Sequence, residues 1–103
     1  MNMEKLREEL EADEGVKYEV YNDHLGYATF GIGHLILPED AQRIIANMMF
    51  NMGRPRLSKF KGMKRGVDSR DWNAAADEMV DSAWYRQVTN RAERLVTRMR
   101  NIT

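Results

Sequence analysis

The sequence contains no cysteine and only two prolines, and it has no long run of apolar residues. Without cysteine the chain forms neither a disulfide nor a thiolate metal site. No stretch is long and apolar enough for a transmembrane helix or a signal-peptide core, so we expect cytoplasmic synthesis, no stable membrane insertion and export by another route. A length of 103 residues indicates one domain with a modest core.

The chain has no overall excess of positive or negative charge, but acidic and basic residues are unevenly distributed along it. The net charge is zero, with 16 basic and 16 acidic residues. Residues 1–53 hold four of the basic and ten of the acidic residues, so residues 54–103 carry the balancing positive charge. Such a basic half can attract a polyanion such as nucleic acid, an anionic membrane or a wall polymer. An equally good interpretation is that these charges coat solvated helix faces.

The first 32 residues predict a helix followed by a β-hairpin. Asn2 can cap a helix whose apolar residues recur at helical spacing, and this helix is expected to stop near Gly15. Residues 16–20 alternate apolar and charged, residues 22–26 are turn-like, and residues 27–32 are rich in aromatic and β-branched residues. The alternation favours two strands.

The rest of the chain predicts helices. Residues 38–52 give the clearest amphipathic pattern, with Gly53 placed to end the helix. A short helix is expected between Pro55 and Gly66, another with Asp68 as its cap, and a last one with Thr89 or Asn90 as its cap. The expected fold is therefore α+β, mostly α: an N-terminal helix, a β-hairpin and about four helices in one domain.

Two kinds of site are disfavoured by spacing. Gly31-Ile32-Gly33 begins like a dinucleotide fingerprint, but Ile36 stands where the third glycine belongs and no βαβ unit follows. Asp23, His24 and His34 match no zinc-binding pattern. We therefore expect no nucleotide cofactor and no metal.

Two carboxylates, Glu14 and Asp23, suit a different chemistry. Glycoside hydrolysis needs one carboxylic acid to protonate the leaving oxygen and a second carboxylate to activate water or form a covalent intermediate. A hydroxyl such as that of Thr29 could help to hold the water. From the residues alone, however, two acids nine positions apart are more simply explained as solvated surface groups.

The order of residues resembles the T-even bacteriophage lysozyme family. Glu14-Gly15, Val20-Tyr21-Asn22-Asp23 and Gly26-Tyr27-Ala28-Thr29-Phe30-Gly31-Ile32-Gly33-His34-Leu35 follow its pattern. Two further blocks match, Asn47-Met48-Met49-Phe50-Asn51-Met52-Gly53 and the segment from Trp72 to Ala92. Together the blocks cover nearly the whole chain. The resemblance implies a reduced β lobe at about 14–36 and a helical lobe at about 1–13 and 38–103.

The resemblance also implies roles for individual residues. Glu14 becomes the general acid, Asp23 the second catalytic carboxylate, and Thr29 a group that positions the attacking water. Arg91 matches the family arginine that pairs with the catalytic glutamate, and His34 is a further supporting residue. The residues expected to contact substrate are Leu35, Phe50 and Asn51.

The implied reaction is hydrolysis of bacterial peptidoglycan without a cofactor. Family members cleave the β-1,4 bond between N-acetylmuramic acid and N-acetylglucosamine with inversion, which requires roughly 6.5–9.5 Å between the carboxyl groups. The resemblance also implies synthesis in the host cytoplasm and action on the cell wall after a holin pore releases the enzyme, causing host lysis.

The chain departs from the family pattern at residues 36–38, where a long segment is missing. The family partner of His34 lies in that segment, and Asn51 replaces a family glutamine. The loss predicts exposed apolar surface and self-association as a homodimer. Three hypotheses follow: a compact active lysozyme, a weak or inactive remnant that folds, self-associates or binds glycan, and a nucleic-acid binder. Retention of Glu14, Asp23 and Thr29 argues against nucleic acid as the partner.

Overall fold

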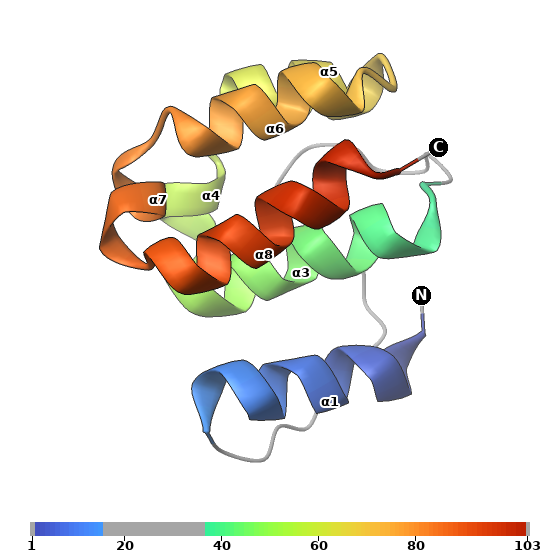
Figure 1. The fold of residues 1–103 in the computed structure, drawn as a ribbon, viewed down its shortest axis with the longest axis vertical. Coiled ribbons are helices and arrows are strands. Elements are labelled where there is room, and N and C mark those ends of the chain that lie inside the picture. The colour runs from blue at the N-terminus through green and yellow to red at the C-terminus, as the bar shows by residue number, and fades with distance from the viewer. Residues whose placement is uncertain (1, 16–36, 103) are drawn as a thin grey trace.

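The structure is a computed structural model that describes residues 2–15 and 37–102 (Figure 1). The described residues form seven helices. Their bounds are α1 Met3–Glu14, α3 Glu39–Met52, α4 Arg54–Leu57, α5 Lys61–Asp68, α6 Trp72–Val80, α7 Ala83–Gln87 and α8 Thr89–Arg100.

The expected α+β fold class is wrong, because the residues that the structure describes form helices and no strand. That expectation depended on a hairpin at residues 16–32, which lies outside the described residues. Across the rest of the chain the apolar residues recur every three or four positions, so each element buries a stripe against other helices. The fold of the described chain is all-α.

The first helix begins and ends as predicted. The Asn2 side chain caps α1 by accepting a hydrogen bond from the Lys5 backbone N–H at 3.0 Å. Gly15 follows the helix in the left-handed region, with φ of 74°, which glycine adopts without steric cost. Glu14 is therefore fixed as the last residue of α1.

The long helix α3 forms the centre of the core, as its sequence pattern predicts. Pro38 precedes the first turn, Glu39 and Asp40 lie at its positive end, and Gly53 follows its end. The buried residues of α3 are Ala41, Ile44, Ile45, Ala46, Asn47, Met48, Met49 and Met52. Most of them join one apolar cluster that α4 to α8 complete.

The helices after α3 differ from the prediction in four places. Two lie near the end of the chain: α7 at Ala83–Gln87 was not predicted from the sequence, and Val88 rather than Thr89 or Asn90 is the cap residue of α8. The other two concern α4 to α6. The stretch from Pro55 to Gly66 contains parts of two helices, α4 and α5, because the chain turns between Leu57 and Lys61. Asp68 ends α5 and pairs with Lys64 at 2.7 Å, rather than capping the next helix. The cap of α6 is Asp71, whose side chain accepts a hydrogen bond from the Ala74 backbone at 3.0 Å.

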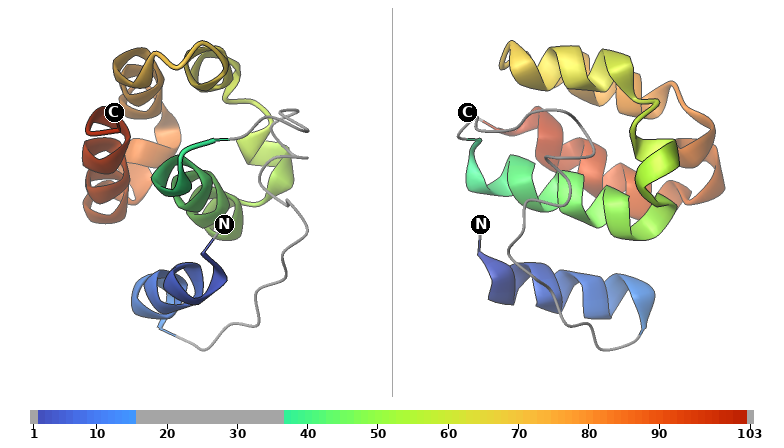
Figure 2. Two further views of the ribbon diagram at one scale, coloured as in Figure 1. Left: turned by 90° about the vertical axis from the view of Figure 1, so that its right-hand side faces the viewer. Right: turned by 180° about the vertical axis from the view of Figure 1, so that it is seen from behind.

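The helices are arranged in three levels (Figures 1 and 2). The α5–α6 pair lies at one end, α3 and α8 pack together in the middle, and α1 lies at the opposite end against α3. The two apolar side chains that α1 buries, Leu6 and Leu10, form a separate small cluster with Ala46 of α3. This small apolar contact leaves room for a polar one between α1 and the middle level.

Close packing of α5 on α6 depends on Gly66. A Cβ at this position would lie 2.6 Å from the backbone nitrogen of Ala75 and 2.9 Å from its Cα. Because backbone atoms of a packed helix cannot move aside alone, we expect Gly66→Ala to lower the free energy of unfolding by about 1–3 kcal/mol, despite the better helix propensity of alanine. Chemical denaturation measures the change.

The matched control is Gly62→Ala, one turn earlier in α5. There the added Cβ meets the side chain of Glu78, whose carboxylate lies at 1.7 Å and can rotate away. We expect little loss, or a small gain, in stability. Equal destabilisation by both substitutions would contradict the argument from close packing.

Candidate functional site

The site is centred on Glu14, at the C-terminal end of α1. Its side chain is 21% exposed, so the carboxylate is partly shielded but still reachable by solvent. Arg91 of α8 donates a hydrogen bond from Nη1 to Oε2 of Glu14. A contact between residues 77 positions apart thus fixes the end of α1 against α8.

Arg91 is itself held by Asn47 and Asp13, which contact its Nε. Its residue is 9% exposed, and its Nε donates a hydrogen bond to Oδ1 of Asn47 at 2.9 Å. The same Nε lies 3.6 Å from Oδ2 of Asp13. A guanidinium is a rigid planar fork, so these contacts on one edge determine where its other nitrogens lie.

Asn47 joins α1 to this arginine. It is 0% exposed in the middle of α3, and its Nδ2 donates hydrogen bonds to Glu9 Oε2 at 2.7 Å and to Asp13 Oδ2 at 3.0 Å. Arg94 of α8 donates to the other oxygen of Asp13 at 2.6 Å. The buried amide therefore has all its principal hydrogen-bonding groups in use.

A second group of charges continues the contact toward the start of α3. Arg98 donates from Nη1 to Glu9 at 2.9 Å and from Nη2 to Asp40 at 2.7 Å. Arg43 of α3 also contacts both carboxylates, at 3.4 Å from Glu9 and 3.2 Å from Asp40. We call the whole set the α1 polar network: Glu9, Asp13 and Glu14 of α1; Asp40, Arg43 and Asn47 of α3; Arg91, Arg94 and Arg98 of α8.

The network shifts the pKa values of two of its members, Asp13 and Arg98. Burial raises the pKa of the Asp13 carboxyl, but hydrogen bonds from Asn47 and Arg94 and the charges of Arg91 and Arg94 outweigh burial and lower it below 3.8. Burial lowers the pKa of Arg98, whereas its hydrogen bonds and charge contacts with two carboxylates raise it overall. Both shifts favour the charged forms that the network pairs.

The structure brings together two of the predicted site residues, Glu14 and Arg91. Phe50 lies partly buried between the two apolar clusters, and the Asn51 side chain accepts a hydrogen bond from the Trp84 indole at 2.6 Å. The other four predicted site residues lie outside the described residues: Asp23, Thr29, His34 and Leu35. The catalytic, binding and supporting roles of all eight remain predictions.

Asn47, Asp13 and Arg94 were not predicted as part of the site. The spacing of the charged residues nevertheless indicates that α1 and α8 pair. Asp13 lies four residues after Glu9, and the arginines at 91, 94 and 98 share one face of a helix. Opposite charges on two helical faces indicate that the faces pair, but no local pattern shows that they belong to the same contact.

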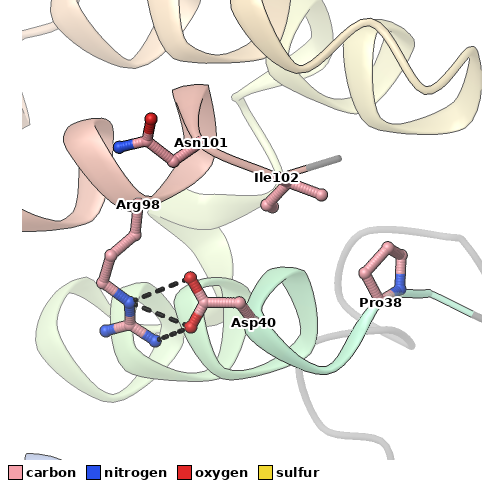
Figure 3. A pocket seen from close by; sticks show the side chains of 5 residues that line it. All are labelled: Pro38, Asp40, Arg98, Asn101 and Ile102. Atoms are coloured by element: carbon pink, nitrogen blue, oxygen red, sulfur yellow. Dashed lines mark hydrogen bonds and ion pairs between the residues drawn. The ribbon is translucent and has the colours of Figure 1, made fainter.

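The open cavity beside Arg98 lies away from Glu14. It has a volume of about 350 Å³ and is lined by Pro38, Asp40, Arg98, Asn101 and Ile102 (Figure 3). Its two charged groups bond to each other, as the dashed lines show. Within residues 2–15 and 37–102 no three acidic or histidine side chains are grouped closely enough to hold a metal ion.

Comparison with known proteins shows similarity to T4-type lysozymes. Two proteins of Dictyostelium discoideum, named probable T4-type lysozymes 1 and 2, are each 24% identical and cover 89% of this chain and 91% of their own length. The pre-baseplate central spike protein Gp5 of Enterobacteria phage T4 is 26% identical over 87% of this chain, which is 26% of that protein. No protein-family model matches, and no solved structure matches significantly.

These relatives confirm the resemblance on which the sequence analysis relied. The chain is similar to T4-type lysozymes over most of its length, which supports a lysozyme-like glycoside hydrolase. The alignments extend over 155 residues, more than the 103 of this chain, so parts of these relatives have no counterpart here. That difference agrees with an internal deletion, whose position near residues 36–38 remains a prediction.

The Asp13 carboxyl makes the stability of the protein depend on pH. Because its pKa is lowered on folding, its contribution is complete above the unfolded value near 3.8 and is lost as the pH falls through the folded value. We expect Asp13→Asn to be less stable than the wild type at pH 7, with the difference shrinking below pH 3.8. Urea denaturation between pH 2 and pH 7 measures this.

The matched control is Asp81→Asn, at an exposed position after α6. It removes the same charge without touching the α1 polar network. We expect it to change stability little at any of these pH values. A deficit for Asp13→Asn that stays constant down to the lowest pH would contradict the assigned role of its charge.

Proposed function

We propose that the protein is a muramidase that hydrolyses the β-1,4 bond between N-acetylmuramic acid and N-acetylglucosamine in bacterial peptidoglycan. The observation that carries this proposal is the partly exposed Glu14 carboxylate, fixed against α8 by Arg91. It occurs in a chain similar to proteins named lysozymes. We propose that residues 1–103 act as one lysozyme-like domain and need no cofactor.

In this proposal Glu14 is the general acid that protonates the leaving glycosidic oxygen. Asp23 activates a water molecule on the opposite face of the sugar, and Thr29 helps to position that water. Direct attack by water gives inversion at the anomeric carbon. Arg91 orients the Glu14 carboxylate, which supports proton donation along one direction. His34 is a further supporting residue.

Leu35, Phe50 and Asn51 are proposed to contact the glycan. Phe50 offers a partly buried ring at the boundary of the two apolar clusters, where one face of a sugar can pack. The hydrogen bond from Trp84 fixes the Asn51 oxygen and leaves its amide nitrogen as a donor for substrate. These two side chains lie near the C-terminal end of α3.

The proposed setting is phage-induced lysis of a bacterial host. The protein would be made in the host cytoplasm and reach the wall after holin-mediated release. None of the described helices is long and apolar enough to cross a membrane. Neither nucleic acid nor the membrane itself is a proposed partner.

The second candidate is a catalytically weak or inactive shortened lysozyme that folds, self-associates or binds glycan. It is favoured by one observation, that the lysozyme relatives contain residues with no counterpart in this chain. If those residues build one wall of a substrate cleft, the shortened protein could hold a glycan without orienting its scissile bond. Glycan binding without cleavage would select this candidate.

The decisive substitution is Glu14→Gln, assayed by release of soluble muropeptides from purified peptidoglycan. Glutamine keeps the shape of the side chain but cannot donate the required proton, so we expect activity to fall by at least about 100-fold. The matched control is Glu8→Gln, an exposed carboxylate two turns earlier in α1. It should keep nearly all of the wild-type activity.

The outcomes separate the two candidates. Activity in the wild type and in Glu8→Gln but not in Glu14→Gln supports the muramidase. Equal activity in all three proteins removes Glu14 from the chemistry. No activity in any of them, with retained binding to insoluble peptidoglycan, establishes the inactive glycan-binding protein instead.

Self-association through surface exposed by the deletion is the second prediction of this proposal. Apolar surface without its usual cover tends to find a partner, and a second copy is always present at the same concentration. We expect light scattering to show a homodimer whose fraction rises between micromolar and millimolar concentrations. A monomeric mass throughout that range would contradict it.

A further inference from the structure

We propose that Asn47 is a positioning residue for the candidate acid Glu14 and acts through Arg91. The inference rests on the proposed function and adds to the working site a residue that is fully buried. Asn47 is 0% exposed, and it bonds Arg91 on one side and two α1 carboxylates on the other. Its place in the sequence, in the middle of a packing helix, gives no indication of such a role.

The amide oxygen of Asn47 holds the Arg91 guanidinium in place. Oδ1 of Asn47 accepts the Arg91 Nε–H at 2.9 Å, while Nη1 of the same guanidinium donates to Glu14. Since the guanidinium is planar and rigid, the position of Nε sets the position of Nη1. The hydrogen bond to Asn47 thereby fixes the direction from which Arg91 meets the Glu14 carboxylate.

Asp13 and Glu14 are alternative partners for the Arg91 guanidinium. Asp13 Oδ2 lies 3.6 Å from Arg91 Nε, beyond hydrogen-bonding distance but close enough for strong attraction. Asn47 Nδ2 donates to that same oxygen at 3.0 Å. The amide thus occupies Asp13 and Arg91 at once and keeps them apart. Without it, we expect the guanidinium to move onto Asp13 and away from Glu14.

Position 47 requires an amide side chain. An aspartate here would add a third negative charge beside Glu9 and Asp13 and would have no N–H to offer them. An apolar residue would leave the Arg91 Nε–H without its acceptor in a buried site, at a cost comparable to a lost hydrogen bond. Asparagine supplies one acceptor and two donors without a net charge.

The test compares the wild type with Asn47→Ala, Arg91→Ala and the double variant in the muropeptide assay. A misplaced acid costs turnover more than substrate affinity, so we expect Asn47→Ala to lower kcat by about 10- to 100-fold with KM nearly unchanged. Met79→Ala, a buried α6 substitution, is the control for lost stability.

The double variant distinguishes positioning from general destabilisation. If Asn47 acts through Arg91, adding Asn47→Ala to Arg91→Ala should lower kcat little further, so the two effects are strongly non-additive. Each variant is first checked for a native circular dichroism spectrum and a cooperative unfolding transition. If Asn47→Ala is not folded, Asn47→Ser takes its place, since its shorter side chain also cannot bridge Arg91 and Asp13.

The outcomes are separable from those of the proposed function. An inactive wild type refutes the proposed function itself, and this inference with it, before any variant is compared. An active wild type with unchanged kcat in folded Asn47→Ala overturns the positioning role alone. The same holds if Met79→Ala lowers kcat with KM nearly unchanged as much as Asn47→Ala does, or if the effects of Asn47→Ala and Arg91→Ala simply add.

Discussion

The attachment of α1 to the rest of the molecule depends on paired charges around one buried amide. The helix buries two leucines, which form a small cluster apart from the main core. Among the described residues, most of its polar contacts with α3 and α8 belong to the α1 polar network. Charged groups taken from water are stabilised only when each has a well-placed partner, so such a contact tolerates one arrangement and disfavours shifted ones. The network therefore specifies the register of α1 more than it adds stability.

That register decides where Glu14 lies. Glu14 is the last residue of α1, so a helix shifted by one turn would carry it away from Arg91. The main core does not make this choice, because its apolar cluster is built by residues 37–99 and does not include α1. The α1 polar network thus positions Glu14, whereas the methionine-rich core stabilises the rest of the fold. Different surfaces of α3 contribute to the network and to the core.

The two surfaces of α3 separate the main core from the contact with α1. One surface carries Ile44, Ile45, Met48 and Met52 into the core, and another presents Arg43, Ala46 and Asn47 to α1. Both contacts are made by described residues, within a chain that is similar to T4-type lysozymes over most of its length.

The sequence by itself determined the helices of strong period, the cap of α1 at Asn2, its end at Gly15 and the resemblance to T4-type lysozymes. Each of these is a local signal, set by neighbouring residues or by their order. The α+β class predicted from alternation at residues 16–32 is wrong, because the residues that the structure describes form helices and no strand. The contact of Glu14 with Arg91 could be expected only from the resemblance, and only the tertiary structure shows that Asn47 joins Arg91 to Glu9 and Asp13. A side chain that joins two helices takes its role from residues distant in sequence, since their distances are fixed only when the helices pack.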